Sequence, residues 1–574
     1  ADGILIESAE EEITFADNFN HMTMPEDCKV TIDEIKGMYM KLDLLDDAVG
    51  VHRAQAMCYA YIYALQHDLA TISVQMTYCN LDTEDIRYFH YDYTFEELAV
   101  WFEKLITEYK KWADFQFAWK KLRQASIKPL QFPFSYREGQ KELAAGVYRT
   151  ISRKKNLFIQ APTGAGKTIS TVFPAVKAVG EDLADKIFYL TAKTITGTVA
   201  REAFELLRKN GYQAKVLTIT AKEKLCLCEE MECNPVNCPY AKGHYDRVND
   251  AVFSLLQKED MITREVILEQ AKEYNVCPFE MCLDTATWVD DIICDYNYVF
   301  DPNVYLKRFF ADGTTGDYIF LVDEAHNLVE RSREMYSAII YKEDFLLAKK
   351  ILKKYGQAKL MRELEKCNRV LLSYKRECEK YVIYESIGNF AFDLMNVASD
   401  LDEFLQKAPE FPERKDLSEF YLNLRNFLNI YELLDDHYVV YAEHEQDGRF
   451  KLKLYCVDPS KNLQERINKG NATIFFSATL LPVGYYKSLL STETDNYAVY
   501  AKTAFREEQK LLLLGNDVSS KYTRRSAGEF ERIASYVKKT TDAKKGNYMV
   551  FFPSYKMMEQ VCDVFLEKCQ SDPS

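Results

Sequence analysis

Residues 154–180 read "KKNLFIQAPTGAGKTISTVFPAVKAVG", and this stretch decides the fold. The apolar run from Leu157 to Gln160 predicts a strand, and the small residues after it form a loop before a helix that starts near Gly166. Gly164 and Gly166 let the backbone wrap closely enough for its N–H groups to cradle phosphates at the helix N-terminus. The stretch therefore predicts a phosphate-binding loop between a strand and a helix.

Two polar side chains at the end of this loop have expected roles. Lys167 is expected to reach the β- and γ-phosphates of a nucleotide, and Thr168 to supply the hydroxyl that ligates Mg²⁺. Ala161 stands where the general pattern of such loops has glycine. The predicted nucleotide-binding residues of the loop are Thr163, Gly164, Ala165, Gly166, Lys167 and Thr168.

A pair of carboxylates follows another apolar run, in "DYIFLVDEAHNLVE" at residues 317–330. The run fits a buried parallel strand, and the carboxylates stand where it ends. Asp323 is expected to hold the magnesium through water, and Glu324 to orient and deprotonate the attacking water. His326 is a candidate sensor of the γ-phosphate, with a surface position at a helix start as the alternative. The predicted catalytic residues are Lys167, Asp323, Glu324 and His326.

Six of the fifteen cysteines collect in two short segments between these motifs. Residues 224–239 read "KLCLCEEMECNPVNCP", and residues 276–282 read "VCPFEMC". We expect a cytoplasmic protein without a membrane span, because no stretch reaches about eighteen apolar residues and the N-terminus lacks a basic segment followed by an apolar one. Cytosolic thiols stay reduced, so the clustered cysteines indicate metal or redox chemistry rather than disulfides.

Composition limits the class of protein further. A chain of 574 residues is too long for one core and is expected to split into about three to five domains. Its 47% hydrophobic and 28% charged residues are typical of an ordinary folded protein. The net charge, 73 − 88 = −15, argues against a generally basic nucleic-acid coat but leaves room for a locally positive channel.

The order of three motifs resembles a known family. The phosphate loop is followed by "DEAH" and then by "NATIFFSATLLP", a strand that ends in Ser477, Ala478 and Thr479. This order resembles the superfamily 2 helicases, and the cysteines narrow the resemblance to the XPD/DinG family over residues 136–574. It implies ATP and Mg²⁺ as cofactors, a 4Fe–4S domain inserted into the first motor domain, and a helical Arch domain after the "DEAH" strand. It also implies movement from 5′ to 3′ on single-stranded DNA, with a role in repair or in clearing unusual DNA structures.

Four cysteines resemble the cluster ligands of this family. Cys226 in "KEKLC" follows a short basic and apolar stretch, as the first ligand does, and Cys277 in "VCPFE" precedes Pro and an aromatic residue, as the last does. Cys238 in "NCPY" resembles the third ligand, and Cys233 is best placed for the second. Thiolates suit iron–sulfur clusters. Zinc is the alternative metal, although the paired spacing of zinc sites is absent. The alternatives for the second and fourth ligands are Cys228 and Cys282.

Other motor positions follow from the same resemblance. "FSYREGQKELA" resembles the region that contacts adenine, which makes Arg137 and Gln140 candidates, with an exposed helix N-terminus as the alternative. "IFYLTAKTITGTVA" resembles the motif that holds one DNA strand by its phosphates. Lys193 and Thr194 would make those contacts, which position a strand without reading its sequence. Helix capping is the alternative role for these hydroxyls.

Residues 331–435 carry apolar side chains three and four apart, which predicts amphipathic helices with one buried face. "HYVVYAEHEQDGRFKLKLYCV" then alternates on both sides of Asp447 and Gly448, which predicts a hairpin. A helical module with a hairpin return fits the Arch domain of the family.

The first 110 residues carry a different pattern. "ADGILIES" and "KVTIDEIKGMY" predict two strands, with Asp2 in the first and Glu34 and Lys36 in the second. Such a carboxylate pair with a nearby lysine binds Mg²⁺ and stabilises developing charge in phosphodiester hydrolysis. In "HRAQAMCYAYIYAL", Gln55 and Tyr59 share a helix face. The order resembles the RecB-type PD-(D/E)XK nucleases, with a plain α/β domain as the alternative. The acidic or His residue that such nucleases carry upstream is expected to be missing.

The predicted fold class is α/β, with RecA-like P-loop motor domains that carry inserted iron–sulfur and helical Arch domains, preceded by a truncated restriction-endonuclease-like α/β domain. The expected domains are a nuclease-type domain at 1–110, a connector at 111–135, the first motor domain at 136–222, 285–330 and 456–505, an iron–sulfur domain at 223–284, an Arch-like insertion at 331–455 and the start of a second motor domain at 506–574. Residues 546–568 are expected to give this last domain one strand and one helix.

The family's Gly-Arg-rich final motif has no counterpart in the sequence. Hydrolysis in these motors needs two domains to close on the nucleotide, so ATP binding is expected of this chain, while turnover and unwinding are expected to depend on the second motor domain as well.

These features predict an ATP-dependent DNA helicase that acts where single-stranded and duplex DNA meet. One alternative is a metal-dependent DNA nuclease whose motor merely feeds it the strand. The other is an ATP-gated DNA-binding clamp that does not separate duplexes.

Overall fold

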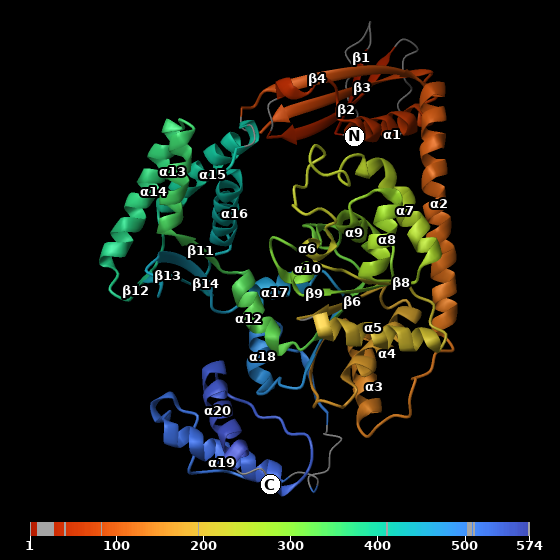
Figure 1. Cartoon of the computed structure of the whole chain (residues 1–574). Helices are drawn as coiled ribbons and strands as arrows, with labels where there is room; N and C mark the ends of the chain where they lie inside the picture. Colours follow the sequence, from red (N-terminus) through yellow and green to blue (C-terminus); the bar gives the residue numbers. More distant parts are fainter. Residues whose placement is uncertain are drawn as a thin grey trace. The chain divides into compact units, whose positions relative to one another are not determined.

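The computed structural model describes residues 2–7, 28–39, 42–81, 83–192, 194–408, 411–501, 508 and 511–571. The chain forms two compact units, residues 1–502 and 503–574. The first unit contains an N-terminal sheet, a large parallel sheet and a small antiparallel sheet with helices packed on it (Figure 1).

The N-terminal domain is built on a four-stranded sheet in the order β1-β2-β3-β4. Its elements are β1 (Gly3–Glu7), β2 (Lys29–Met38), the short 3-10 helix η2 (Leu42–Leu44), α1 (Gly50–Gln66), β3 (Thr71–Asn80) and β4 (Ile86–Thr94). The pair β2 and β3 is parallel, and the other two pairs are antiparallel. The crossover helix α1 buries Ala56, Ala60 and Ala64, whose small side chains share one face and let the helix approach the sheet closely.

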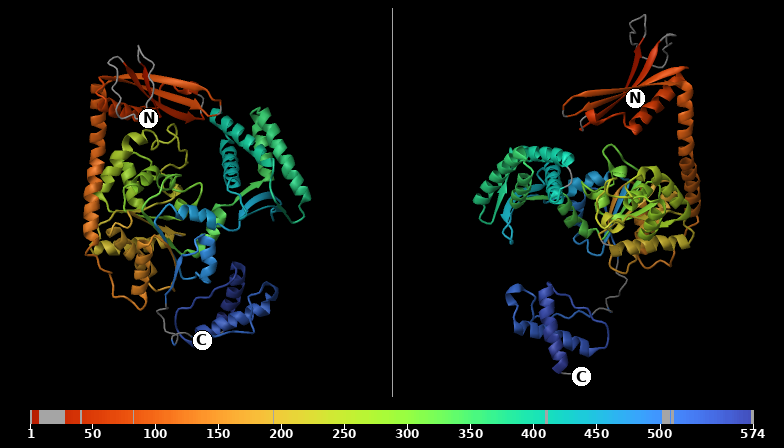
Figure 2. Two further views of the ribbon diagram at one scale, coloured as in Figure 1. Left: turned by 180° about the vertical axis from the view of Figure 1, so that it is seen from behind. Right: turned by 45° about the horizontal axis from the view of Figure 1, so that its top comes forward.

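One helix of 33 residues, α2 (Phe95–Ile127), leaves this domain and continues unbroken to the large sheet (Figure 2). Thr94 and Glu97 start it with a reciprocal capping box. Near its other end Arg123 is buried and donates to Oδ1 of Asp290 at 2.7 Å. Loss of either partner would leave a buried charge unpaired, at a cost of about 3–5 kcal/mol. This ion pair fixes the end of α2 to the sheet.

Eight parallel strands form the large sheet, in the order β16-β5-β15-β10-β6-β9-β7-β8. They are β5 (Asn156–Gln160), β6 (Lys186–Thr191), β7 (Val216–Thr218), β8 (Met261–Ile262), β9 (Asp291–Asp295), β10 (Tyr318–Asp323), β15 (Ala472–Ser477) and β16 (Tyr497–Tyr500). Alternate residues enter separate cores on the two faces: Phe158 and Phe320 one, Ile159 and Leu321 the other. Burial on both faces explains the continuous apolar runs, and the predicted α/β class is confirmed.

Three helices pack on this sheet: α3 (Gln140–Ser152), α4 (Lys167–Gly180) and α5 (Thr194–Lys209). The carboxyl ends of parallel strands share one edge of a sheet, and ligands bind at that edge. Because β5, β15 and β10 are neighbours, the three sequence motifs that follow them meet there.

The cysteine-bearing segment lies between β7 and β9. Its helices are α6 (Lys222–Leu225), α7 (His244–Lys258), α8 (Arg264–Tyr274) and α9 (Pro278–Ala286). Strand β8 of this segment pairs with β7, and Val252 and Leu255 of α7 share a core with Phe320 of β10. The segment predicted as a separate domain at 223–284 therefore adds an edge strand to the motor sheet. The short helices α10 (Asn297–Phe300) and α11 (Lys307–Phe310) lead on to β10.

A helical module with its own core follows β10 and α12 (His326–Met335). Its elements are β11 (Ala338–Tyr341), α13 (Lys342–Lys354), α14 (Ala358–Glu377), β12 (Tyr381–Tyr384), α15 (Phe390–Lys407), α16 (Arg414–Tyr431), β13 (Tyr438–His444) and β14 (Phe450–Cys456). The predicted hairpin forms here, with His444 opposite Phe450 across the turn. The chain then returns to the large sheet through α17 (Ser460–Ile467), β15 and α18 (Val483–Leu490).

The second unit contains the 3-10 helix η4 (Tyr522–Arg524), α19 (Ala527–Ala543) and α20 (Tyr555–Ser571), with Phe530 and Met557 in its small core. The helix predicted after residue 546 is present, but the predicted strand is wrong: residues 547–552 form none, and Phe551 is exposed. A strand needs a neighbour for its backbone hydrogen bonds, and the described part of this unit offers no other strand. Among the described helices of the whole chain, none has the length and apolar character to cross a bilayer.

Candidate functional site

The phosphate loop folds as a tight turn between β5 and α4. Gly164 and Gly166 have φ of +85° and +70°, in the left-handed region that favours glycine. A Cβ at Gly166 would stand 2.6 Å from Nε2 of Gln140, so a larger residue there would displace that amide. Lys167 begins α4, and its ammonium donates to the carbonyl of Ala161 at 3.3 Å. The loop therefore holds its one cation close to the backbone that forms the phosphate cradle.

The two residues predicted to contact adenine lie against this loop. The guanidinium of Arg137 donates to the carbonyl of Gly164 at 2.5 Å, and its backbone N–H donates to Oε1 of Gln140 at 3.1 Å. Gln140 is only 6% exposed. The structure thus brings both residues to the nucleotide loop, and Gln140 is not an exposed helix start. Their contact with adenine stays a prediction.

Asp323 is the last residue of β10, and its carboxyl group accepts hydrogen bonds from two donors. Tyr189 donates to Oδ2 at 2.9 Å, and the N–H of Glu324 donates to Oδ1 at 2.9 Å. Burial raises the pKa of Asp323 to about 6, and the bond from Tyr189 opposes the rise. The same phenol also bonds Thr168. Tyr189 therefore joins the two predicted magnesium ligands, a role hidden in the sequence because the residue sits within an apolar strand.

We expect Tyr189→Phe to move the pH dependence of MgATP binding. Without the phenol, the charged form of Asp323 loses a hydrogen bond, and its pKa rises further. The charged carboxylate of Asp323 is protonated as pH falls through its raised pKa, and Mg²⁺ then loses this ligand. A bond of about 1 kcal/mol moves this loss roughly 0.7 pH unit higher. Fluorescent-nucleotide titrations from acid to neutral pH measure the shift, with Tyr148→Phe on α3 as the control. Coincident profiles of variant and parent would refute the role.

The third motif contacts Glu324, the predicted catalytic carboxylate. Ser477, at the end of β15, donates to Oε2 of Glu324 at 3.0 Å and lies 2.7 Å from Nδ1 of His326. The backbone N–H of Thr479 donates to the same hydroxyl at 3.1 Å. Glu324 has a φ of +48°, which costs a non-glycine residue on the order of 1–3 kcal/mol and persists only where the surroundings hold it. The motifs therefore form one hydrogen-bonded group around a strained glutamate.

Five of the six clustered cysteines lie in or beside the loop that follows α6. Cys226 directly follows α6, and Cys277 directly precedes α9. Sγ of Cys228 lies 3.8 Å from Sγ of Cys238, and Cys233 is exposed. Burial and the neighbouring sulfurs of Cys238 and Cys226 raise the pKa of Cys228 to about 11. The structure thus brings Cys228, which the sequence left as an alternative, into the group.

Cys282 does not fit a ligand role. It lies in the hydrophobic core with no exposed surface, and burial raises its pKa to about 12. The other five cysteines are half-buried or exposed, so burial in the core sets Cys282 apart. These five fit the donor set of a four-thiolate cluster, since they are soft ligands held by one loop and a helix start.

The residues predicted for the nuclease-type site converge on the N-terminal sheet. Lys36 donates to Oε1 of Glu34 at 2.7 Å and to Oε1 of Gln55 at 3.2 Å. The amide of Gln55 donates to the hydroxyl of Tyr59 at 3.4 Å. Oδ2 of Asp2 accepts, at 2.8 Å, the backbone N–H of the residue between Glu34 and Lys36. The antiparallel pairing of β1 with β2 and the packing of α1 thus bring all five residues into one group.

Glu34 is the buried centre of this group. It is 2% exposed, and its Oε2 has no hydrogen-bond partner among the described residues. A buried carboxylate oxygen without a partner is costly, so such an oxygen indicates a missing ligand. Mg²⁺ is a hard cation that takes oxygen ligands of this kind.

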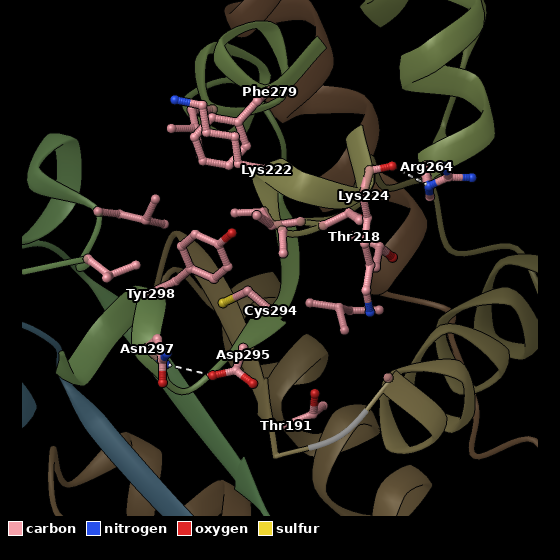
Figure 3. A pocket seen from close by; sticks show the side chains of 18 of the residues that line it. Thr191, Thr218, Lys222, Lys224, Arg264, Phe279, Cys294, Asp295, Asn297 and Tyr298 are labelled. Atoms are coloured by element: carbon pink, nitrogen blue, oxygen red, sulfur yellow. Dashed lines mark hydrogen bonds between the residues drawn. The ribbon is translucent and has the colours of Figure 1, made fainter. Parts of the chain in front are cut away.

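A cavity of about 940 Å³ opens at the carboxyl ends of β6, β7 and β9 (Figure 3). Hydroxyls of Thr191 and Thr218 and the rings of Phe279 and Tyr298 line it. The basic residues of its wall are Arg201, Lys222, Lys224, Arg264, Lys307 and Arg308. Cations that follow a phosphate backbone, together with rings on which bases stack, suit a single nucleic-acid strand.

The residues predicted to contact DNA fall at the margin of this cavity. Lys193 lies outside the described residues, as does the side chain of Thr194, whose backbone opens α5. Thr191 and Thr198, which flank them in sequence, line the cavity.

Comparison with known proteins gives several relatives. The DEAD_2 family model matches residues 206–345. The ATP-dependent DNA helicase XPD of Sulfolobus acidocaldarius is 23% identical over 444 residues, which cover 74% of each chain. A probable ATP-dependent helicase of Methanocaldococcus jannaschii is 24% identical over 485 residues, which cover 75% of this chain and 71% of the relative. A solved XPD helicase structure covers 75% of this chain and 74% of its own, with 21% identity and a TM-score of 0.44.

The phosphate loop and the "DEAH" carboxylates lie at one edge of the large sheet, where Tyr189 bridges Thr168 and Asp323. The similarities to these relatives support the resemblance to the XPD/DinG family seen in the sequence. The N-terminal nuclease-type domain lies outside the residues that the family model matches and stays a prediction.

Proposed function

We propose that the chain is an ATP-dependent DNA helicase. The observation that carries the proposal is the hydrogen-bonded group of Glu324, Ser477 and His326 at the sheet edge that also holds the phosphate loop. Lys167 binds the phosphates, and Thr168 and Asp323 hold Mg²⁺. Glu324 takes the proton of the attacking water. ATP turnover with and without single-stranded DNA tests the proposal. We expect a several-fold rise with DNA, and turnover indifferent to DNA would contradict it.

The strand is proposed to run through the cavity at the ends of β6, β7 and β9. The six basic residues of its lining, which outnumber the four carboxylates, support this route, because phosphate contacts position a strand without reading its sequence. The family resemblance supports movement from 5′ to 3′ and work in DNA repair or replication. We place this work in the cytoplasm, where reduced thiols favour a metal cluster over disulfides.

We propose that the clustered cysteines hold a 4Fe–4S cluster. Cys226, Cys238 and Cys277 are three ligands, and Cys233 is the fourth, with Cys228 as its alternative. When bound, the cluster supplies a four-thiolate cross-link between the loop and the start of α9. The insertion it stiffens forms one wall of the cavity.

Metal content separates these cysteines by role. Protein purified without oxygen is expected to carry about four iron and four sulfide per chain and to absorb near 400 nm. We expect Cys238→Ser to lose most of the iron, because it removes a central ligand. Cys282→Ser, the control, keeps the iron because its sulfur is in the core. Iron lost in Cys228→Ser or in Cys233→Ser shows which of these two cysteines is the remaining ligand. One zinc and no iron in the parent protein would contradict the cluster.

A second candidate function is Mg²⁺-dependent cleavage of DNA by the N-terminal domain. The unpartnered Oε2 of Glu34 favours it, beside the ammonium of Lys36 and the strand that carries Asp2. The carboxylates would hold the metal, and Lys36 would stabilise the charge that develops on the phosphate. Degradation of labelled DNA with Mg²⁺ and without ATP tests it, and intact DNA would contradict it.

A further inference from the structure

The turn at which β9 ends and α10 begins, residues 295–298, lies between the cavity and the predicted catalytic carboxylates. Asp295, Asn297 and Tyr298 line the cavity, as Figure 3 shows. Tyr296 is fully buried, and its hydroxyl reaches the end of β10. Neighbouring residues of one short turn therefore contact the cavity and the hydrolysis site.

The hydroxyl of Tyr296 bonds the backbone on both sides of the strained residue. It donates to the carbonyl of Asp323 and lies 3.1 Å from the carbonyl of Glu324. These carbonyls belong to the two peptide units that flank the φ of +48°. Directly after Glu324, the N–H of Ala325 donates to the carbonyl of Phe476 at 3.2 Å. Tyr296 is therefore one of the groups that fix the conformation from which Glu324 reaches Ser477.

A second attachment joins the same turn to the helix after the carboxylates. Arg331, on α12, donates to Oδ1 of Asn297 at 2.9 Å and to Oδ1 of Asp295 at 3.3 Å. The first residue of α12 is His326, which contacts Ser477. The turn is thus tied to the backbone of Glu324 directly and to the following helix through a guanidinium.

We propose that residues 295–298 transmit strand binding in the cavity to ATP hydrolysis, with Tyr296 and Arg331 as positioning residues for Glu324. The inference rests on the proposed function of the motor. A strand in the cavity contacts the partly exposed side chains of Asp295 and Asn297, and its phosphates repel the carboxylate of Asp295 toward Arg331, the cation that it already contacts. Because Tyr296 shares this backbone, the carbonyl of Glu324 shifts with the turn.

The test measures ATP turnover with and without oligo-dT for Tyr296→Phe and Arg331→Gln. We expect the stimulation by oligo-dT to fall roughly fivefold or more in each variant. We expect the KM for ATP to stay within about twofold, because the described contacts of neither side chain include the phosphate loop. A merely structural defect would raise the KM for ATP together with the loss of stimulation.

Two matched variants control for packing. Tyr336→Phe removes another buried hydroxyl. This hydroxyl donates to the carbonyl of Phe300 at 2.5 Å and not to the backbone of Asp323 or Glu324. Arg333→Gln removes another guanidinium of α12, one that bonds Glu330 and the carbonyl of Val457. Both controls are expected to keep the stimulation of the parent protein.

The outcomes separate this inference from the function on which it rests. Full stimulation in Tyr296→Phe and Arg331→Gln, in a protein whose parent is stimulated, would overturn the coupling. Equal losses in Tyr296→Phe and Tyr336→Phe would also overturn it, because they would reflect packing alone. A parent without DNA-stimulated turnover would instead contradict the proposed helicase function.

Discussion

Glu324→Gln is expected to lower ATP turnover by about 10²–10⁴-fold, the usual contribution of a general base. The amide keeps the shape of the side chain and still accepts the hydrogen bond from Ser477, but it cannot take a proton from water. Thr168 and Asp323 remain in place to hold Mg²⁺. The variant should therefore bind MgATP with nearly the affinity of the parent protein while failing to cleave it.

Rapid-quench hydrolysis and a nucleotide titration on the same preparation measure the two effects separately. Glu330→Gln is the matched control, since it changes an exposed glutamate of the neighbouring helix α12. Turnover by Glu324→Gln at the rate of the parent protein would show that Glu324 is not the base.

Glu34→Gln and Lys36→Met are each expected to lower Mg²⁺-dependent DNA cleavage by about 10²–10³-fold. The first removes a charge from the buried carboxylate proposed to hold Mg²⁺, whose Oε2 has no partner among the described residues, and the second removes the ammonium 2.7 Å from its other oxygen. ATP turnover is expected to stay at the level of the parent protein, because both residues belong to the N-terminal sheet and not to the motor sheet.

Lys29→Met is the matched control for this site. Lys29 lies on the same strand as Glu34, β2. Its ammonium forms an ion pair with Asp92, with 3.4 Å between Nζ and Oδ1, rather than with Glu34. Glu324→Gln gives the reverse comparison, since it should keep cleavage while losing ATP turnover. Cleavage that survives in Glu34→Gln would assign the nicking to another site or to a contaminant.

The motor site could be predicted from sequence because each part is local. The phosphate loop, the "DEAH" carboxylates and Ser477 each follow a continuous apolar strand, and parallel pairing brings the ends of such strands together. The nuclease-type group could be predicted for a similar reason. Gln55 and Tyr59 have helical spacing, and Glu34 and Lys36 have the spacing of alternate residues on a strand.

Other features depend on contacts that no short motif records. Tyr189 reads as an ordinary core aromatic in an apolar strand, and Tyr296 stands between two polar residues in no recognised motif. Only the fold shows that their hydroxyls reach Asp323 and the Glu324 carbonyl. Loop geometry, not spacing, places Cys228 beside Cys238. The strand predicted at 547–552 is absent because its formation depends on a neighbouring strand and not on its own apolar residues.

The measurement that most directly tests the central claim is strand displacement on a duplex with a single-stranded 5′ tail, followed by the fluorescence of a labelled strand. We expect the parent protein to separate the strands with MgATP, but not with a non-hydrolysable ATP analogue, and Glu324→Gln to fail with either. DNA binding that responds to nucleotide in the parent protein, without any separation of the duplex, would contradict the helicase function and establish an ATP-gated clamp.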